Sequence, residues 1–456
     1  MTAADPLKPL PGRSGFLIGL RESLDYLRNP DQFIAARSAQ YGPVFGTTLF
    51  FQPTAVVGGI GAIEEFLRKE RSISESSLPE TFTALHTPYG ALNQQGARHR
   101  STRAGYAPLF NKSAFEGFLP TLNRRITAFV DQVVDQGTTR IAFDCKRVCL
   151  DLFAECFAGE ALTDREAEAF ITYNDALLSL SKLLPSYRRG EAALTELQIA
   201  MTQRLVRFRR GELHGNALEV FSTNHDENGE PWSDERIATA TVLLIWGAYI
   251  EVAALMSKSL ILCSDKASVR ERILEEASRQ QLGDRDRHGT VEDWTLPYVQ
   301  GVLRESLRLM PPAGGGFRRT SIDLAIAGFR IPSGTVVTAD PRIGNRMASM
   351  FPDPERFAPE RWTIPNGAAT SRCPVAGSAR RLPNGAWFPG GIGSHGCPGI
   401  PLAELCVRLF LVRWMQSIRA WNQPPEAANA VPYSLMPIRI PTDDYCLIVD
   451  PVAPSP

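Results

Sequence analysis

The chain lacks an excess of charge of either sign, because 49 Lys and Arg residues balance 49 Asp and Glu residues. A nucleic-acid-binding protein would need a basic surface, so we expect no nucleic-acid partner. The chain also lacks CxxC pairs, although it contains eight cysteines. Without a recurring cysteine framework, we expect reduced thiols in an intracellular protein.

The first residues lack the charged start, the apolar stretch and the small-residue cleavage site of a secretory signal. Long uninterrupted apolar runs are lacking as well. The longest run, residues 238–255, contains Tyr249 and Glu251, so it predicts a buried core helix rather than a membrane span. These features predict a cytoplasmic protein without a membrane anchor.

Helical spacing of apolar residues is present along most of the chain, whereas strand signals are short. The strongest helix should begin after Ser233, which can cap it, and end near Cys263. The predicted helices cover residues 20–41, 61–69, 233–263, 294–310 and 398–420, and the predicted strands lie at 44–51, 55–58, 323–329 and 335–338. We therefore expect a mainly α fold with small β-sheets. It should form a single domain of residues 1–456 whose β-rich part lies near residues 40–60.

A glycine-rich segment, residues 388–399, contains Cys397 directly before the last predicted helix. Pro398 suits the first position of that helix, where its missing N–H costs little. Inward-facing backbone amides and the helix N-terminus would stabilise a thiolate at Cys397. A thiolate is the electron-donating ligand that a haem iron needs for O–O cleavage, whereas the alternatives are a buried structural cysteine and a redox thiol. The glycines assigned to binding the cofactor are Gly391, Gly393 and Gly399.

Three further segments favour the haem interpretation. Residues 305–308 read Glu-Ser-Leu-Arg, residues 357–362 read Phe-Ala-Pro-Glu-Arg-Trp, and residues 96–103 read Gly-Ala-Arg-His-Arg-Ser-Thr-Arg. Together with the cysteine segment, they resemble the ExxR, FxPER[FW] and cofactor-contacting segments of the cytochrome P450 family. The resemblance covers essentially the whole chain. It implies haem b (iron protoporphyrin IX) between the central long helix and the cysteine-ligand helix, with Cys397 as the axial ligand.

The resemblance also assigns roles to charged side chains. Glu305, Arg308 and Arg361 would form a buried network, which costs desolvation unless every partner is satisfied. Four basic residues would face the haem propionates, as cationic donors to carboxylates. They are His99, Arg103, Arg318 and His395. The alternative for each of these four is a solvated surface residue.

The central helix departs from the family pattern of glycine, any residue, an acid and threonine. The best alignment places Gly247 on the glycine, Tyr249 on the acid and Ile250 on the threonine, so the usual proton-guiding pair is missing. Helical spacing places Gly247, Ile250, Glu251 and Ala254 on one face. Glu251 is therefore a candidate substitute acid, and Tyr249 is a second candidate. The alternatives are a paired buried acid for Glu251 and a core aromatic for Tyr249.

Two other features bear on the site. The family usually has Phe seven residues before the cysteine, where this chain has Gly390, so we expect a more exposed thiolate. Trp246, with a polar residue five positions later, is similar to the prostacyclin synthase and bile-acid-forming sterol hydroxylase branch. Residues 315–318, Gly-Gly-Phe-Arg, are also similar to the retinoid and sterol hydroxylase branch.

The resemblance implies a substrate pocket lined by residues 78–92, 170–184, 246–254 and 313–317. These segments are apolar and aromatic, so we expect a hydrophobic small-molecule substrate. The residues assigned to this pocket are Trp246, Ala254, Gly314 and Gly315. Three basic residues before the cysteine could dock a ferredoxin or flavodoxin that works with its reductase, although a solvated loop is the alternative. They are Arg372, Arg380 and Arg381.

Several functions therefore remain open. The first is a monooxygenase-like enzyme that oxidises a secondary metabolite or lipid-like molecule with electrons from separate redox partners. The second is a haem-thiolate enzyme that uses peroxide or rearranges its substrate, which the missing acid–alcohol pair favours. A non-catalytic haem-binding protein and a haem-free helical protein are the remaining alternatives.

Overall fold

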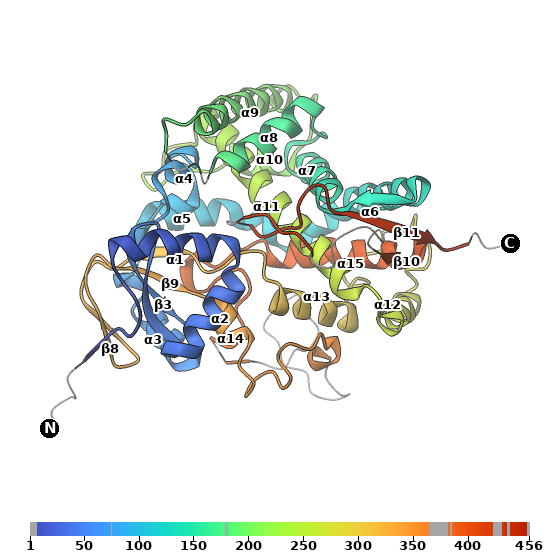
Figure 1. Ribbon diagram of the computed structural model, residues 1–456. Helices are drawn as coiled ribbons and strands as arrows, with labels where there is room; N and C mark the ends of the chain where they lie inside the picture. The colour runs from blue at the N-terminus through green and yellow to red at the C-terminus, as the bar shows by residue number, and fades with distance from the viewer. Residues whose placement is uncertain are drawn as a thin grey trace.

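The computed structural model describes residues 7–73, 75–177, 179, 181–363, 382–383, 385–422, 431–435 and 438–453. Most of this part of the chain is helical, and the strands gather around the N-terminal part of the fold and near the C-terminus (Figure 1). The longer helices are α1 (Phe16–Arg28), α2 (Pro30–Tyr41), α3 (Ile60–Arg68), α5 (Gly96–Tyr106), α6 (Lys112–Gln136), α7 (Ile141–Ala158), α8 (Asp164–Ala176), α9 (Pro185–Arg209), α11 (Asp234–Cys263), α12 (Ala267–Arg279), α13 (Pro297–Leu309) and α15 (Ile400–Ser417). The shorter ones are α4 (Glu80–Leu85), α10 (Asn216–Ser222) and α14 (Pro341–Asn345).

Three small sheets accompany the helices in the described residues. One sheet has the order β2-β3-β9-β6-β4, with β3 and β9 parallel and the other pairs antiparallel. Its strands are β2 (Val44–Leu49), β3 (Gln52–Val57), β4 (Glu75–Ser76), β6 (Phe317–Arg319) and β9 (Val336–Ala339). The other two sheets have the orders β1-β8-β7 and β10-β11-β5. Their strands are β1 (Lys8–Pro9), β7 (Leu324–Ile326), β8 (Phe329–Ile331), β5 (Thr138–Arg140), β10 (Ile418–Asn422) and β11 (Cys446–Pro451). The predicted mainly α fold with small sheets is confirmed.

Helix α11 runs through the middle of the helical part, between α7, α9, α13 and α15 (Figure 1). Its N-terminus is capped as the sequence predicts, because the Ser233 hydroxyl accepts a hydrogen bond from the Arg236 N–H at 3.2 Å. By length and composition α11 could cross a membrane, but 83% of its most apolar window is buried inside the protein. Its apolar sequence is therefore explained by its position in the core.

Two predicted helix boundaries were wrong for local reasons. The helix predicted over residues 20–41 is divided into α1 and α2, because Asn29 caps a new helix and Pro30 occupies its first turn. The helix predicted over residues 398–420 ends at Ser417, where the chain continues as β10 and pairs with β11. Tertiary pairing decides the second boundary, which helical periodicity alone could not show.

Replacing Ser233 with Ala tests the capping of α11. The substitution removes the acceptor for the Arg236 N–H, so we expect the free energy of unfolding to fall by about 1 kcal/mol. Urea unfolding followed by circular dichroism measures the change. The matched control is Ser222→Ala at the exposed end of α10, which should change stability by less than about 0.5 kcal/mol. Equal losses in the two variants would contradict the assignment.

Candidate active site

The cysteine segment folds into a tight loop that depends on glycine. Gly390, Gly391 and Gly393 have φ angles of 75°, 87° and 77°, a region that other residues rarely adopt. The Cys397 N–H donates to the Gly390 carbonyl at 2.8 Å, and the Gly396 N–H donates to the Gly393 carbonyl at 3.0 Å. These bonds bring both ends of the loop together and place Cys397 just before α15.

The Cys397 thiol is accessible, but the surrounding protein partly desolvates it. The residue is exposed, yet desolvation by the surrounding protein raises the pKa of its thiol. Backbone N–H groups of Gly399 and Ile400, at the start of α15, and the Arg103 guanidinium act in the opposite direction. An accessible sulfur that protein atoms partly desolvate, with several donors around it, is suited to hold a metal as a thiolate.

Gly390 replaces the family's usual Phe for a packing reason. A Cβ atom at Gly390 would lie 2.8 Å from Ile400 Cγ1 and 2.9 Å from Cys397 Cβ. Ile400 therefore occupies the volume beside the cysteine that a side chain at position 390 would need. Cys397 is exposed, and an aliphatic side chain covers this flank of it, so a thiolate more exposed than is usual in the family stays a prediction.

Helix α11 has one open face. From Arg236 to Leu260 every residue is buried except Leu244, Gly247, Ala248 and Glu251. Their spacing of three and four residues places them on one face of the helix. A Cβ atom at Gly247 would meet no other atom within 4 Å. Glu251 also raises the pKa of Cys397, so this face and the thiol lie within electrostatic reach of each other.

The four residues predicted to share one face of α11 differ in exposure. Gly247 and Glu251 belong to the open face, whereas Ile250 and Ala254 are buried. Leu244 and Ala248 complete the open face nearer the helix N-terminus, and the sequence did not single them out. Their signal was present in the spacing, because Leu244 lies three residues before Gly247 and Ala248 lies three residues before Glu251.

Tyr249 lies on another side of α11. Its side chain is fully buried, with its ring 6.2 Å from that of Phe170 on α8. Its hydroxyl has no hydrogen-bond partner among the described residues. Burial raises the pKa of Tyr249, and the negative charges of Asp175 and Asp443 act in the same direction. We therefore assign Tyr249 to the packing of α11 against α8, which argues against its predicted catalytic role.

Four basic residues from three elements gather beside the cysteine loop. The rings of His99 on α5 and His395 are stacked with their centroids 3.9 Å apart. Arg103, one turn after His99, donates from Nη2 to the Gly396 carbonyl at 2.7 Å. Arg318 on β6 is buried and donates weakly to the Ile392 carbonyl at 3.4 Å. Burial and the positive charge of Arg318 lower the pKa of His395 to about 4, so His395 is neutral near neutral pH.

These features fit a haem. The accessible sulfur of Cys397 supplies a thiolate, the open face of α11 leaves room for a flat ring, and the basic cluster supplies donors for two carboxylates. Cys397 would hold the iron, and the propionates would be held by His99, Arg103, Arg318 and His395. The roles of Gly391, Gly393 and Gly399 would be conformational, because they shape the loop around the sulfur.

An aromatic wall continues from the open face of α11. Trp246 is buried and donates from Nε1 to the Asn174 side chain on α8 at 3.2 Å. His86, which follows α4, lies edge-on to Trp246 with ring centroids 4.7 Å apart. Its Nδ1 lies 3.2 Å from the Tyr173 hydroxyl, and burial lowers the pKa of His86 to about 3, so its ring is neutral. No local motif marks His86, Tyr173 and Asn174, so the sequence did not identify them individually.

Gly314 and Gly315, which were assigned to the pocket, have close contacts with Arg342 and with β9 that a side chain would disturb. A Cβ atom at Gly315 would lie 1.9 Å from the Ala339 carbonyl on β9, and one at Gly314 would lie 2.6 Å from Arg342 Nη1. Gly316 is exposed, and a Cβ atom there would meet nothing within 4 Å. A pocket-lining role for Gly314 and Gly315 stays a prediction. Leu178 and Leu180 of the predicted lining lie outside the described residues, as do Arg372, Arg380 and Arg381.

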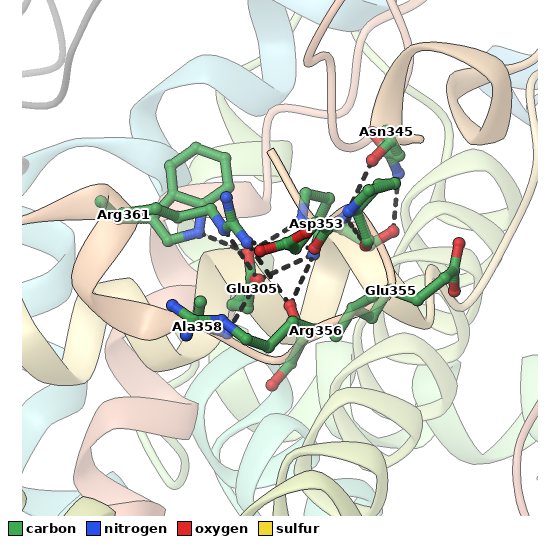
Figure 2. A network of polar contacts seen from close by, with 12 residues as sticks. Glu305, Asn345, Asp353, Glu355, Arg356, Ala358 and Arg361 are labelled. Atoms are coloured by element: carbon green, nitrogen blue, oxygen red, sulfur yellow. Dashed lines mark hydrogen bonds and ion pairs between the residues drawn. The ribbon is translucent and has the colours of Figure 1, made fainter. Parts of the chain in front are cut away.

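A buried carboxylate lies at the centre of a network of hydrogen bonds and ion pairs (Figure 2). Glu305 on α13 accepts hydrogen bonds from Arg308 Nη2 at 2.7 Å and Arg361 Nε at 3.0 Å. The indole N–H of Trp362 and the Ala358 N–H also donate to it, at 2.8 and 3.0 Å. Burial alone would raise the pKa of Glu305, but these donors, Arg308 foremost, leave it below its usual value. Arg308 is fully buried as well.

The guanidinium of Arg308 extends this network to the backbone. It donates to the carbonyl groups of Asn345 at 2.9 Å and Arg356 at 3.2 Å. Every strong acceptor and donor of the pair is therefore satisfied, which a buried ion pair requires. The network ties α13 to the segment after α14 and to the 3-10 turn Pro359–Trp362.

Comparison with known proteins agrees with the geometry. The family model for cytochrome P450 matches residues 9–429. The chain therefore belongs to the cytochrome P450 family, and it is an oxidoreductase of the monooxygenase type.

Individual relatives cover nearly all of the chain. A putative cytochrome P450 120 from Synechocystis sp. is 28% identical over 90% of each protein. Human cytochrome P450 26C1 is 26% identical over 98% of this chain and 90% of its own length. A solved structure of cyanobacterial CYP120A1 with bound retinoic acid has a TM-score of 0.84 at 26% identity, and the match covers 98% of this chain and 100% of that one.

Replacing Glu305 with Gln tests the buried network. The variant leaves Arg308 without its counter-charge in the core, so we expect the free energy of unfolding to fall by about 3–5 kcal/mol. Urea unfolding of the purified protein measures the loss. Glu360→Gln, which neutralises an exposed carboxylate in the adjacent turn, should cost less than about 1 kcal/mol. A Glu305 variant as stable as the Glu360 variant would show that the network is not a structural requirement.

Proposed function

We propose that this protein uses haem b to oxygenate a hydrophobic small molecule with electrons from a separate ferredoxin or flavodoxin and its reductase. The observation that carries the proposal is the open face of α11, which presents apolar and small residues and one acid, Glu251, within electrostatic reach of the Cys397 thiol. The retinoic acid in the CYP120A1 structure supports a hydrophobic, lipid-like substrate class. A cytoplasmic location remains part of the proposal.

Different residues of the protein would hold the haem and orient the substrate. Haem held by Cys397 supplies the iron centre at which dioxygen is activated. Leu244, Gly247 and Ala248 provide an apolar surface that excludes water and orients the substrate. Trp246 is fixed by its bond to Asn174, so it provides a rigid wall above this surface.

Glu251 is the proton donor in this proposal. Burial raises the pKa of Glu251 to about 7, while the positive charge of Lys258 two turns later acts in the opposite direction. A carboxyl group with a pKa near the working pH can both give up and regain a proton. Ile250 has no hydroxyl, so Glu251 would deliver protons through water rather than through an alcohol partner.

A second candidate function is peroxide use or substrate rearrangement without dioxygen. It is favoured by Ile250, since the family's acid–alcohol pair is missing from α11. The two candidates differ in whether external electrons are needed.

Product analysis under two oxidant supplies separates the candidates. A hydrophobic ligand that shifts the ferric haem spectrum is incubated either with dioxygen and surrogate redox partners or with hydrogen peroxide alone. We expect oxygenated product with dioxygen and electrons. Product with peroxide alone, and none with electrons, would contradict the monooxygenase proposal and support the second candidate.

The pH dependence tests Glu251. Its protonated form is the proton donor, so turnover should be high below pH 7 and fall as the pH rises through about 7. Glu251→Gln cannot release a proton, so we expect turnover to fall by about 10²-fold or more and the pH dependence near 7 to vanish. The control is Glu235→Gln, which removes an exposed acid from the same helix. A Glu251 variant with the wild-type rate and pH profile would remove Glu251 from the mechanism.

A further inference from the structure

The cysteine loop is held from outside by Glu70, which neither the sequence nor the family motifs singled out. Glu70 begins the 3-10 turn Glu70–Ser72 that follows α3. Its Oε1 accepts hydrogen bonds from the Ser394 N–H at 2.7 Å and the Ser394 hydroxyl at 2.8 Å. The contact joins two residues that lie 324 positions apart in the sequence. Ser394 lies three residues before Cys397.

The loop is shaped to admit this carboxylate. A Cβ atom at Gly393 would lie 2.3 Å from Glu70 Oε1, so a side chain at position 393 would displace the Glu70 carboxylate from Ser394. Gly393 therefore serves two needs, a positive φ of 77° and the close approach of Glu70.

A second side chain holds the loop from a different element. Arg103 on α5 donates to the Gly396 carbonyl at 2.7 Å, directly before Cys397. Glu70 binds a backbone donor of the loop and Arg103 binds a backbone acceptor. The short segment between Gly393 and Cys397 is thus fixed at two points by oppositely charged groups.

Glu70 also brings negative charge to the basic cluster. It accepts from Arg318 Nη1 at 3.3 Å. Burial lowers the pKa values of His99 and His395 overall, and the negative charge of Glu70 offsets part of that lowering. Burial would raise the pKa of Glu70 itself, but the bonds from Ser394 and Arg318 lower it overall, so the carboxyl group is ionised. Its charge therefore offsets part of the positive charge that faces the haem propionates.

We propose that Glu70 is a positioning residue for the axial thiolate, which fixes the Cys397 loop through Ser394 and makes the haem harder to reduce by placing a negative charge beside Arg318. The proposal rests on the haem-thiolate site proposed above. It assigns two separable effects to one carboxylate, a hydrogen-bonding effect on the loop and an electrostatic effect on the cofactor.

Four variants of the holoenzyme separate these effects. Glu70→Gln keeps an oxygen acceptor for Ser394 but removes the charge, and Glu70→Ala removes both. Ser394→Ala removes one of the two hydrogen bonds and keeps the charge. Glu64→Gln, on α3, removes an exposed carboxylate and is the matched control. Two quantities are measured: the midpoint potential of the ferric–ferrous couple, and the rate at which the ferrous–carbon monoxide complex loses its thiolate-type Soret band.

We expect both Glu70 variants to have a more positive midpoint potential than the wild type. Loss of the thiolate-type band should be about tenfold faster or more in Glu70→Ala, because a hydrogen bond to a charged group is lost, and less than about twofold faster in Glu70→Gln. Ser394→Ala should lie between these two in rate and keep the wild-type potential. Glu64→Gln should change neither quantity.

Two results would overturn the proposal in distinguishable ways. If wild-type protein forms no thiolate-type carbon monoxide complex, the haem-thiolate function itself fails, and the role of Glu70 fails with it. If wild-type protein forms the complex but both Glu70 variants match Glu64→Gln in potential and rate, only the role of Glu70 fails.

Discussion

The structure depends on the placement of the Cys397 sulfur. A cofactor must reach this atom from inside the fold, and the protein must shield it from bulk water. Glycines with positive φ let the loop fold back on itself before Cys397, and the first amides of α15 face the sulfur. Ile400 covers one flank, where the family usually has an aromatic residue. Across from the thiol, α11 is buried everywhere from Arg236 to Leu260 except on one four-residue face. The two features together define a cofactor site between these helices.

The charged residues of this region have two different tasks. Glu305 and Arg308 are fully buried, and their partners satisfy them completely, so their role is to join α13 to the chain that leads into the cysteine segment. The basic cluster of His99, Arg103, Arg318 and His395 instead gathers beside the cysteine loop, where it would bind the haem propionates. Glu70 contacts both the cysteine loop and the basic cluster. It fixes the loop through Ser394, and its negative charge lowers the net positive charge of the cluster.

Sequence reasoning succeeded where short segments carry the information. The cap of α11, the glycine loop and the Glu305–Arg308 pair could be predicted because their partners lie a few residues apart or belong to a family motif. It could not show contacts between distant segments. Tyr249 packs against Phe170, and Gly314 lies close to Arg342, and no local pattern marks either contact. Glu70 contacts Ser394 across 324 residues, and no local pattern marks such a pair.

The most direct test of the account is the iron X-ray absorption spectrum of the purified holoenzyme, which shows whether sulfur is in the first coordination shell. The account predicts one sulfur neighbour in the wild type and in Cys406→Ser, which alters a buried cysteine on α15. It predicts none in Cys397→Ser. A sulfur neighbour that persists in Cys397→Ser, or that is missing from the wild type, would contradict the assignment of Cys397 as the axial ligand.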